Sequence, residues 1–192
     1  MRAMPASTLR RRLGANDTRL CLRANALSER DAIRAYFVAV SRLGDGVFWY
    51  VLMAGFVLTG GLWGLGVALH LAITGVIALS LYTWLKRWTR RPRPCAADAR
   101  IHARVAPLDE FSFPSGHTLH AVAFTCVALA HAPALAWVLV PFAASVAVSR
   151  VVLGLHYPSD VIAATGIGGV LAWLSCRACD AWLPLQTTAA GL

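Results

Sequence analysis

The sequence has little charge for its length. Only 14% of its 192 residues are Asp, Glu, Lys or Arg, whereas 58% are hydrophobic. Residues 46–85 and 111–149 contain no charged residue at all. Helices of soluble proteins normally keep a polar face towards water. These absences therefore argue against a soluble protein and favour an integral membrane protein.

Each uncharged window is long enough for two membrane crossings. The windows hold 40 and 39 residues, and a helix of that length extends roughly 60 Å, about twice the thickness of the hydrocarbon core of a bilayer. We predict two helical hairpins, the first turning at the glycines between 60 and 66 and the second at residues 131–133. The predicted crossings are residues 46–62, 65–85, 115–131 and 134–152.

The two ends of this region predict two further helices. Residues 161–176 form a third uncharged run of 16 residues, short for a crossing unless Arg177 reaches outward, and Pro158 suits a first helical position. Before the first hairpin, Ser28 and Asp31 resemble a capping box, and apolar residues recur at helical spacing up to Gly44. We predict an all-α, polytopic membrane helix bundle with about five crossings and an N-terminal interfacial amphipathic helix.

Basic residues dominate the chain outside the apolar windows. The formal net charge is +9, but no nucleic-acid-binding module is recognisable, so we expect membrane lipids rather than nucleic acid as partners. Residues 1 to about 20, with arginines at 10, 11 and 12, are expected to form a disordered tail against lipid headgroups. The predicted organisation is a flexible basic segment over residues 1–27 and one membrane-embedded domain over 28–192.

Cysteine gives little indication of metal or redox chemistry. Of five cysteines, only Cys176 and Cys179 form a CxxC pair, at a predicted helix end. Such a pair alone is weak evidence for a metal. We interpret these cysteines as small residues in helix packing.

Three polar clusters interrupt the apolar chain, and an even number of predicted crossings separates each from the next. All three therefore lie on one side of the membrane. Lys86, Arg93 and Arg150 supply three cations, and guanidinium groups bind phosphate oxygens in bidentate geometry. A phosphate ester or anhydride is the substrate that fits these charges best. Asp109 and Glu110 are expected to offset the positive charge of the loop.

The second cluster combines a predicted helix start with a histidine. Residues 114–116 read Pro-Ser-Gly, so the backbone amides of Ser115, Gly116 and His117 are expected to point at the same anion. His117 is a candidate general acid for the leaving-group oxygen. His156 is a candidate nucleophile that must be neutral to attack phosphorus, and Asp160, four residues later, is positioned to hold its far ring nitrogen.

At these positions the sequence resembles the type 2 phosphatidic acid phosphatase family, which shares its active site with vanadium haloperoxidases. The family signature has three parts: Lys, six residues and Arg-Pro; Pro-Ser-Gly-His; and Ser-Arg, five residues, His, three residues and Asp. Residues 86–94, 114–117 and 149–160 match every signature position. The remaining histidines, at 70, 102, 120 and 131, match none.

The resemblance implies a role for each matched residue. Lys86, Arg93, Ser115, Gly116 and Arg150 would bind phosphate, His117 would be the acid, His156 the nucleophile and Asp160 its partner. It also implies a multi-pass protein, in the cell (inner) membrane if bacterial, that works without a metal or another cofactor. The implied reaction is hydrolysis of a lipid phosphomonoester or diphosphate through a phosphohistidine.

Several functions fit this signature. The lipid could be phosphatidate, phosphatidylglycerophosphate, undecaprenyl diphosphate or a lipid A phosphate. Transfer of the phosphoryl group to a lipid acceptor would use the same residues. A non-catalytic lipid-binding protein is a third alternative, and the intact His117, His156 and Asp160 argue against it. The oligomeric state is left open.

Two arguments disagree about which side of the membrane holds the site. By crossing parity, 17 of the 18 lysines and arginines share the side of the three clusters, and the positive-inside rule then places them in the cytoplasm. Bacterial relatives often act on the outer face, and arginines that bind substrate inflate the count. We favour the outer face.

Reporter fusions at residues 100 and 192 test this topology. Three predicted crossings separate the two positions, so a reporter active on only one side of the membrane should give opposite signals, with residue 100 outside. Equal signals would contradict an odd number of crossings between them.

Overall fold

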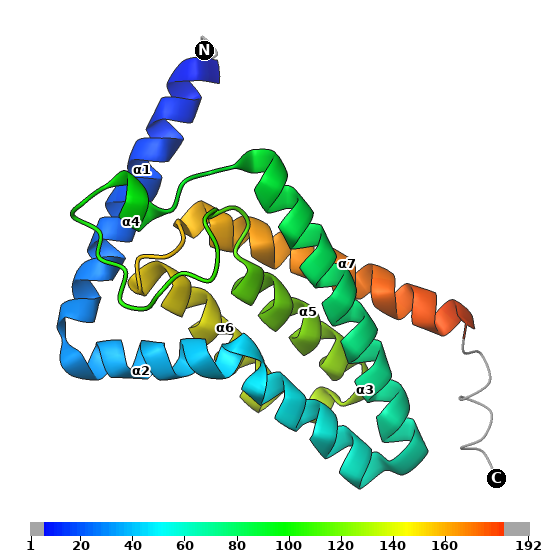
Figure 1. Ribbon diagram of the computed structural model, residues 1–192. Coiled ribbons are helices and arrows are strands. Elements are labelled where there is room, and N and C mark those ends of the chain that lie inside the picture. Colours follow the sequence, from blue (N-terminus) through cyan, green and yellow to red (C-terminus); the bar gives the residue numbers. More distant parts are fainter. Residues whose placement is uncertain (1–5, 183–192) are drawn as a thin grey trace.

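The computed structural model describes residues 6–182, which form helices and no strand (Figure 1). This confirms the predicted all-α class. The elements are α1 Ala6–Ala26, η1 Leu27–Glu29, α2 Asp31–Arg42, η2 Leu43–Val47, α3 Phe48–Thr89, α4 Pro94–Ala97, α5 Gly116–His131, η3 Pro133–Leu135, α6 Ala136–Val152 and α7 Pro158–Trp182.

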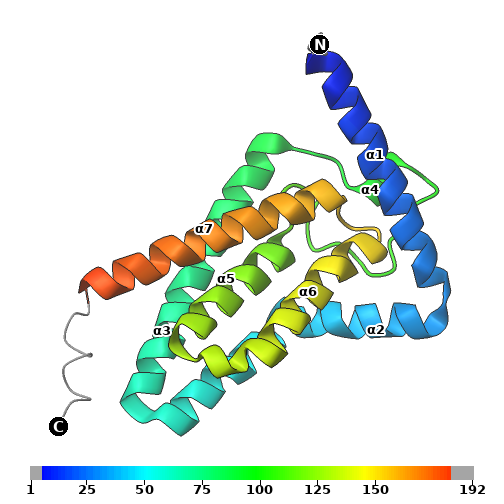
Figure 2. The same cartoon turned by 180° about the vertical axis from the view of Figure 1, so that it is seen from behind.

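Helix α5 lies at the centre of the bundle. It packs against α3, α6 and α7, and Figure 2 shows it from behind between these helices. Its alanines at 121, 123 and 128 are fully buried, and such small residues let helices approach closely. Val67 and Leu71 of α3 meet Val127 of α5 and Leu139 of α6 in the main apolar core. The start of α5, which carries the second polar cluster, is therefore fixed by three neighbours.

Helix α3 is a hairpin of two arms, as the sequence predicts. Its backbone leaves helical geometry at Gly61, where φ is 55° and ψ is −129°, and the chain reverses there (Figure 1). Gly64 packs against the other arm so closely that an added Cβ would lie 1.8 Å from the Phe56 carbonyl oxygen. The predicted turn between residues 60 and 66 is confirmed.

The other predicted helix ends also agree with the structure. Helix α5 ends at His131, and α7 begins at Pro158. Helix α7 contains 25 residues, or roughly 37 Å of helix. It is therefore much longer than the uncharged run of 16 residues that predicted it.

Three helical stretches are long and apolar enough to cross a membrane: Asp31–Thr89, Pro133–Val152 and Pro158–Cys179. The first contains both arms of the α3 hairpin. Leu58, Leu62 and Trp137 are large apolar side chains exposed on these stretches, as lipid-facing residues are in a membrane helix. The number of crossings and the interfacial position of α2 stay predictions.

The N-terminal region differs from the sequence prediction. Residues 6–26 form α1 rather than a disordered tail. Asn25 binds the carbonyl oxygens of His102 and Val152 through its side-chain amide, at 2.9 and 3.0 Å. Long-range contacts of this kind are not visible in local composition, which explains the error. The side chains of the arginines at 10, 11 and 12 lie outside the described residues, and the division at residue 27 stays a prediction.

The predicted capping box is wrong. Ser28 lies in η1 and is buried, and its hydroxyl donates to the Asn25 carbonyl oxygen at 2.6 Å. Helix α2 begins at Asp31 without a side-chain cap. The Ser28 hydroxyl is thus used to join α1 to η1.

A substitution at the hairpin tests its packing. Gly64→Ala forces a methyl group into the Phe56 carbonyl, so we expect a loss of about 1–3 kcal/mol of stability, the usual range for overpacking. Gly66→Ala is the matched control, because an added Cβ there meets nothing within 4 Å. Thermal unfolding of the purified protein in detergent measures both. Equal midpoints for the two variants would contradict the close approach.

Candidate active site

The three polar clusters meet at one cavity of about 780 Å³. Six of the eight predicted site residues line it: Lys86, Arg93, Gly116, His117, Arg150 and His156. They come from the end of α3, the segment before α4, the start of α5, the end of α6 and the α6–α7 loop. Segments more than sixty residues apart in the sequence therefore share one site.

His156 is buried and held by two hydrogen bonds. Its Nδ1 lies 2.6 Å from the Ser112 carbonyl oxygen, which can only accept, so Nδ1 carries the proton. The opposite nitrogen, Nε2, accepts from Arg93 Nη1 at 3.2 Å. Burial, together with the charges of Arg150, Arg93 and Lys86, places the pKa of His156 well below its ordinary value. The imidazole is neutral, and its lone pair faces the cations.

Asp160 is near this ring but is not its hydrogen-bond partner. Its Oδ2 lies 3.7 Å from His156 Nδ1, and its oxygens accept from the Tyr157 amide at 2.9 Å and from Arg91 at 2.7 Å. The four-residue spacing predicts that Asp160 itself holds the ring. The Ser112 carbonyl does so instead, because the carboxylate is already engaged by these two donors.

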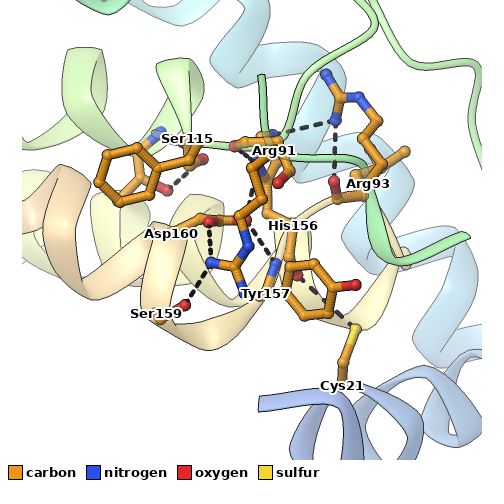
Figure 3. Close-up of polar contacts among 12 residues, drawn as sticks. Cys21, Arg91, Arg93, Ser115, His156, Tyr157, Ser159 and Asp160 are labelled. Carbon is orange, nitrogen blue, oxygen red and sulfur yellow. Dashed lines mark hydrogen bonds and ion pairs between the residues drawn. The ribbon is translucent and has the colours of Figure 1, made fainter. Parts of the chain in front are cut away.

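Arg91 connects Asp160 to helix α1. Its guanidinium binds Ser159 and Asp160 from one side and Asp17 from the other, at 2.6 to 2.7 Å. The Tyr157 ring lies 4.1 Å from its central carbon. Figure 3 shows Arg91 beside Ser159, Asp160 and Tyr157, with Cys21 below them. Arg91 is thus a bridge behind the site rather than part of the cavity lining.

Ser115 also lies behind the cavity. It is the N-cap of α5: its hydroxyl accepts from the Thr118 amide, and its own amide donates to the Asp160 carbonyl oxygen. Its side chain is fully buried. Of the three amides expected at the anion, that of Ser115 is therefore already used. Gly116 and His117 remain at the cavity wall.

Asp109 forms ion pairs with two of the three cations. Its carboxylate accepts from Lys86 Nζ and from Arg93 Nη2, the latter at 2.9 Å. Burial alone would raise the pKa of Asp109, but the Lys86 and Arg93 interactions outweigh it and the pKa lies below its ordinary value. An ionised carboxylate therefore lies where the oxygens of a phosphate are expected.

Arg150 and His117 face different partners. Arg150 donates to the Ser41 hydroxyl, whereas its Nε is buried without a hydrogen-bond partner among the described residues. His117 Nε2 pairs with the Asp45 carboxylate, which comes from η2. Asp45 thus contacts the predicted general acid directly.

Asp45, Arg91 and Ser112 are not among the residues that the sequence predicts for the site. Asp45 carries a usable signal, because it stands between two glycines and is the last charged residue before the first uncharged window. Arg91 lies inside the first signature segment but at a position that the signature leaves open. Ser112 acts through its backbone, so its side chain gives no signal. Among residues 6–182, no group of three or more potential ligands is arranged for a metal ion, and a metal-free reaction stays a prediction.

The chain is similar in sequence to known phosphatases. The chain is 30% identical over 116 residues to undecaprenyl-diphosphatase BcrC of Bacillus subtilis, covering 60% of each protein. It is 34% identical over 87 residues to phosphatidylglycerophosphatase B of Escherichia coli, covering 38% of this chain and 33% of that protein. The chain thus matches less than two thirds of the length of these relatives.

Solved structures show the same fold. A transmembrane PAP2-type phosphatidylglycerolphosphate phosphatase from Bacillus subtilis superposes with a TM-score of 0.72 at 23% identity, over 88% of this chain and 86% of that one. LpxE of Aquifex aeolicus gives 0.67 at 24% identity, over 83% and 93%. With the three apolar helical stretches, this similarity identifies an integral membrane protein.

The sequence profile of the PAP2 superfamily matches residues 61–182. That range covers 122 of the 192 residues and includes all three polar clusters. The chain therefore belongs to the PAP2 superfamily.

Proposed function

We propose that this protein is a membrane lipid phosphatase that removes the terminal phosphoryl group of a lipid phosphomonoester or diphosphate, with His156 as nucleophile. The observation that carries the proposal is the state of His156. It is buried and neutral, its Nδ1 proton is held by the Ser112 carbonyl, and its Nε2 lone pair faces Arg93. A neutral imidazole beside clustered cations suits attack on a phosphorus atom bound by those cations.

The proposed reaction has two steps. Lys86, Arg93 and Arg150 bind the phosphoryl oxygens, and the Nε2 lone pair of His156 forms the N–P bond. The P–O bond to the lipid breaks, its electron pair stays on the leaving oxygen, and His117 donates a proton to that oxygen. Water then attacks the phosphorus of the phosphohistidine and gives a proton to His117, while the N–P bond breaks and its electron pair returns to Nε2 of His156. Inorganic phosphate leaves, and both histidines regain their starting protonation states.

A lipid substrate is supported by the rest of the cavity. Besides its charged and polar residues, the wall includes the apolar side chains of Trp49, Met53, Val76 and Leu79 from both arms of α3. The relatives named above act on undecaprenyl diphosphate and phosphatidylglycerophosphate, as their names state. A substrate labelled in its terminal phosphate distinguishes hydrolysis from transfer to a lipid acceptor. Hydrolysis releases the label as free phosphate, whereas transfer places it on the acceptor.

Replacing the nucleophile tests the mechanism. His156→Ala should lower phosphate release by about 10³-fold or more, because the covalent route is lost. Acid-labile label from a terminally labelled prenyl diphosphate should be trapped on the unaltered protein and not on the variant. His102→Ala is the matched control, since His102 is exposed and matches no signature position. Full activity in His156→Ala would contradict the proposal.

Removing the internal carboxylate tests the cation site. Asp109→Asn frees Lys86 and Arg93 from a competing anion, so the variant should bind orthovanadate, a tetrahedral phosphate analogue, about tenfold more tightly, or ~1.4 kcal/mol. Inhibition constants measure this effect.

Glu110→Gln is the control, because it removes the same charge from the neighbouring residue, for which no ion pair is found within residues 6–182. Weaker vanadate binding by Asp109→Asn would mean that Asp109 positions the cations rather than competes for them.

A further inference from the structure

A second cavity adjoins the first on the side of His117. Its volume is about 280 Å³. His117, Arg150, Asp45 and Leu108 line both cavities. The residue proposed to protonate the leaving group therefore stands at the boundary between them.

The second cavity brings two cations that the first does not use. Arg42, at the end of α2, is exposed, and Arg104, in the loop before α5, is half-buried. With Arg150 they make three guanidinium groups against one carboxylate, Asp45. This balance favours an anion, and a guanidinium group matches phosphate oxygens in geometry.

Arg150 extends from one cavity into the other. It lines both, and its Nη1 donates to Ser41, which belongs to the second cavity only. Arg150 is 3% exposed, and its Nε has no hydrogen-bond partner among the described residues. A buried guanidinium N–H without an acceptor is costly, and an anion between the cavities would satisfy it.

We propose that the second cavity binds the phosphate that stays on the lipid, so that the site is built for lipid diphosphates rather than monophosphates. This inference rests on the proposed function. The distal phosphoryl group lies among Lys86, Arg93 and Arg150, the bridging oxygen faces His117, and the proximal phosphate lies with Arg42 and Arg104.

The chemistry of the diphosphate matches this arrangement. The His156 Nε2 lone pair forms the N–P bond to the distal phosphorus while the bond from that phosphorus to the bridging oxygen breaks. The electron pair stays on the bridging oxygen, now part of a lipid monophosphate, and His117 supplies its proton. Arg42 and Arg104 offset the negative charge that develops on this leaving phosphate.

The test compares two substrates that differ in one phosphate. Full-length protein in detergent is assayed with farnesyl diphosphate and farnesyl monophosphate, and the ratio of their kcat/KM values is determined. The double substitution Arg42→Gln and Arg104→Gln should lower this ratio at least about tenfold, the loss typical of one charge-assisted contact or more. Arg100→Gln, an exposed arginine in the same loop that lines neither cavity, should leave the ratio unchanged.

Arg104 also donates to the Ser28 hydroxyl at 2.8 Å, so Arg42→Gln alone serves if the double variant does not fold. It should lower the ratio in the same direction. Inorganic pyrophosphate should also raise the unfolding midpoint of the unaltered protein more than orthophosphate does, and Arg42→Gln should reduce that difference.

The outcomes separate the two proposals. An unchanged ratio, or an equal loss on both substrates, overturns the second subsite and leaves the phosphatase proposal intact. If the unaltered protein hydrolyses neither substrate nor other lipid phosphates, the proposed function itself is overturned, and the subsite with it.

Discussion

Three cations share one pocket in this membrane protein, and the fold must balance their charge. Lys86, Arg93 and Arg150 are each at most 6% exposed. Like charges removed from water lose hydration and repel one another, so they require acceptors in the folded state. The chain supplies the Asp109 carboxylate to two of them and the Ser41 hydroxyl to the third. The groups that stabilise these cations are therefore the groups with which an incoming anion must compete.

The two histidines of the cavity have nearest partners of opposite charge. The nearest partner of His156 Nε2 is the guanidinium of Arg93, and that of His117 Nε2 is the carboxylate of Asp45. A neighbouring cation favours the neutral imidazole that a nucleophile requires. The Asp45 carboxylate acts in the opposite direction on His117, but burial and the charges of Arg150 and Lys86 outweigh it, and the pKa of His117 also lies below its ordinary value. Two histidines that line one cavity thus have neighbours of opposite charge. Helix α5 brings His117 to Asp45 of η2, whereas the α6–α7 loop brings His156 to Arg93.

Local signals in the sequence predict most of the helices and the residues that meet at the cavity. The turn at Gly61 and the start of α7 at Pro158 follow from backbone preferences that act within a few residues. The pairings of Asp45, Asp109 and Arg91 do not follow in this way, since each joins segments that become neighbours only in the folded bundle. Helix α1 does not follow from the sequence for the same reason: its composition is polar, and its contacts with the rest of the chain are long-range.

Those long-range contacts connect the surroundings of His156 to the N-terminal helix. Asp160 is fully buried beside His156, and a buried carboxylate is tolerated only with a cation or hydrogen-bond donors. Arg91 supplies the cation, and Arg91 is itself held by Asp17 of α1 and by the Tyr157 ring. Asp17 also accepts from the Ser159 amide at 3.0 Å, which fixes the first turn of α7. Although the superfamily profile begins at residue 61, a helix that precedes it by 35 residues therefore helps to hold Asp160 beside the ring of His156, the proposed nucleophile.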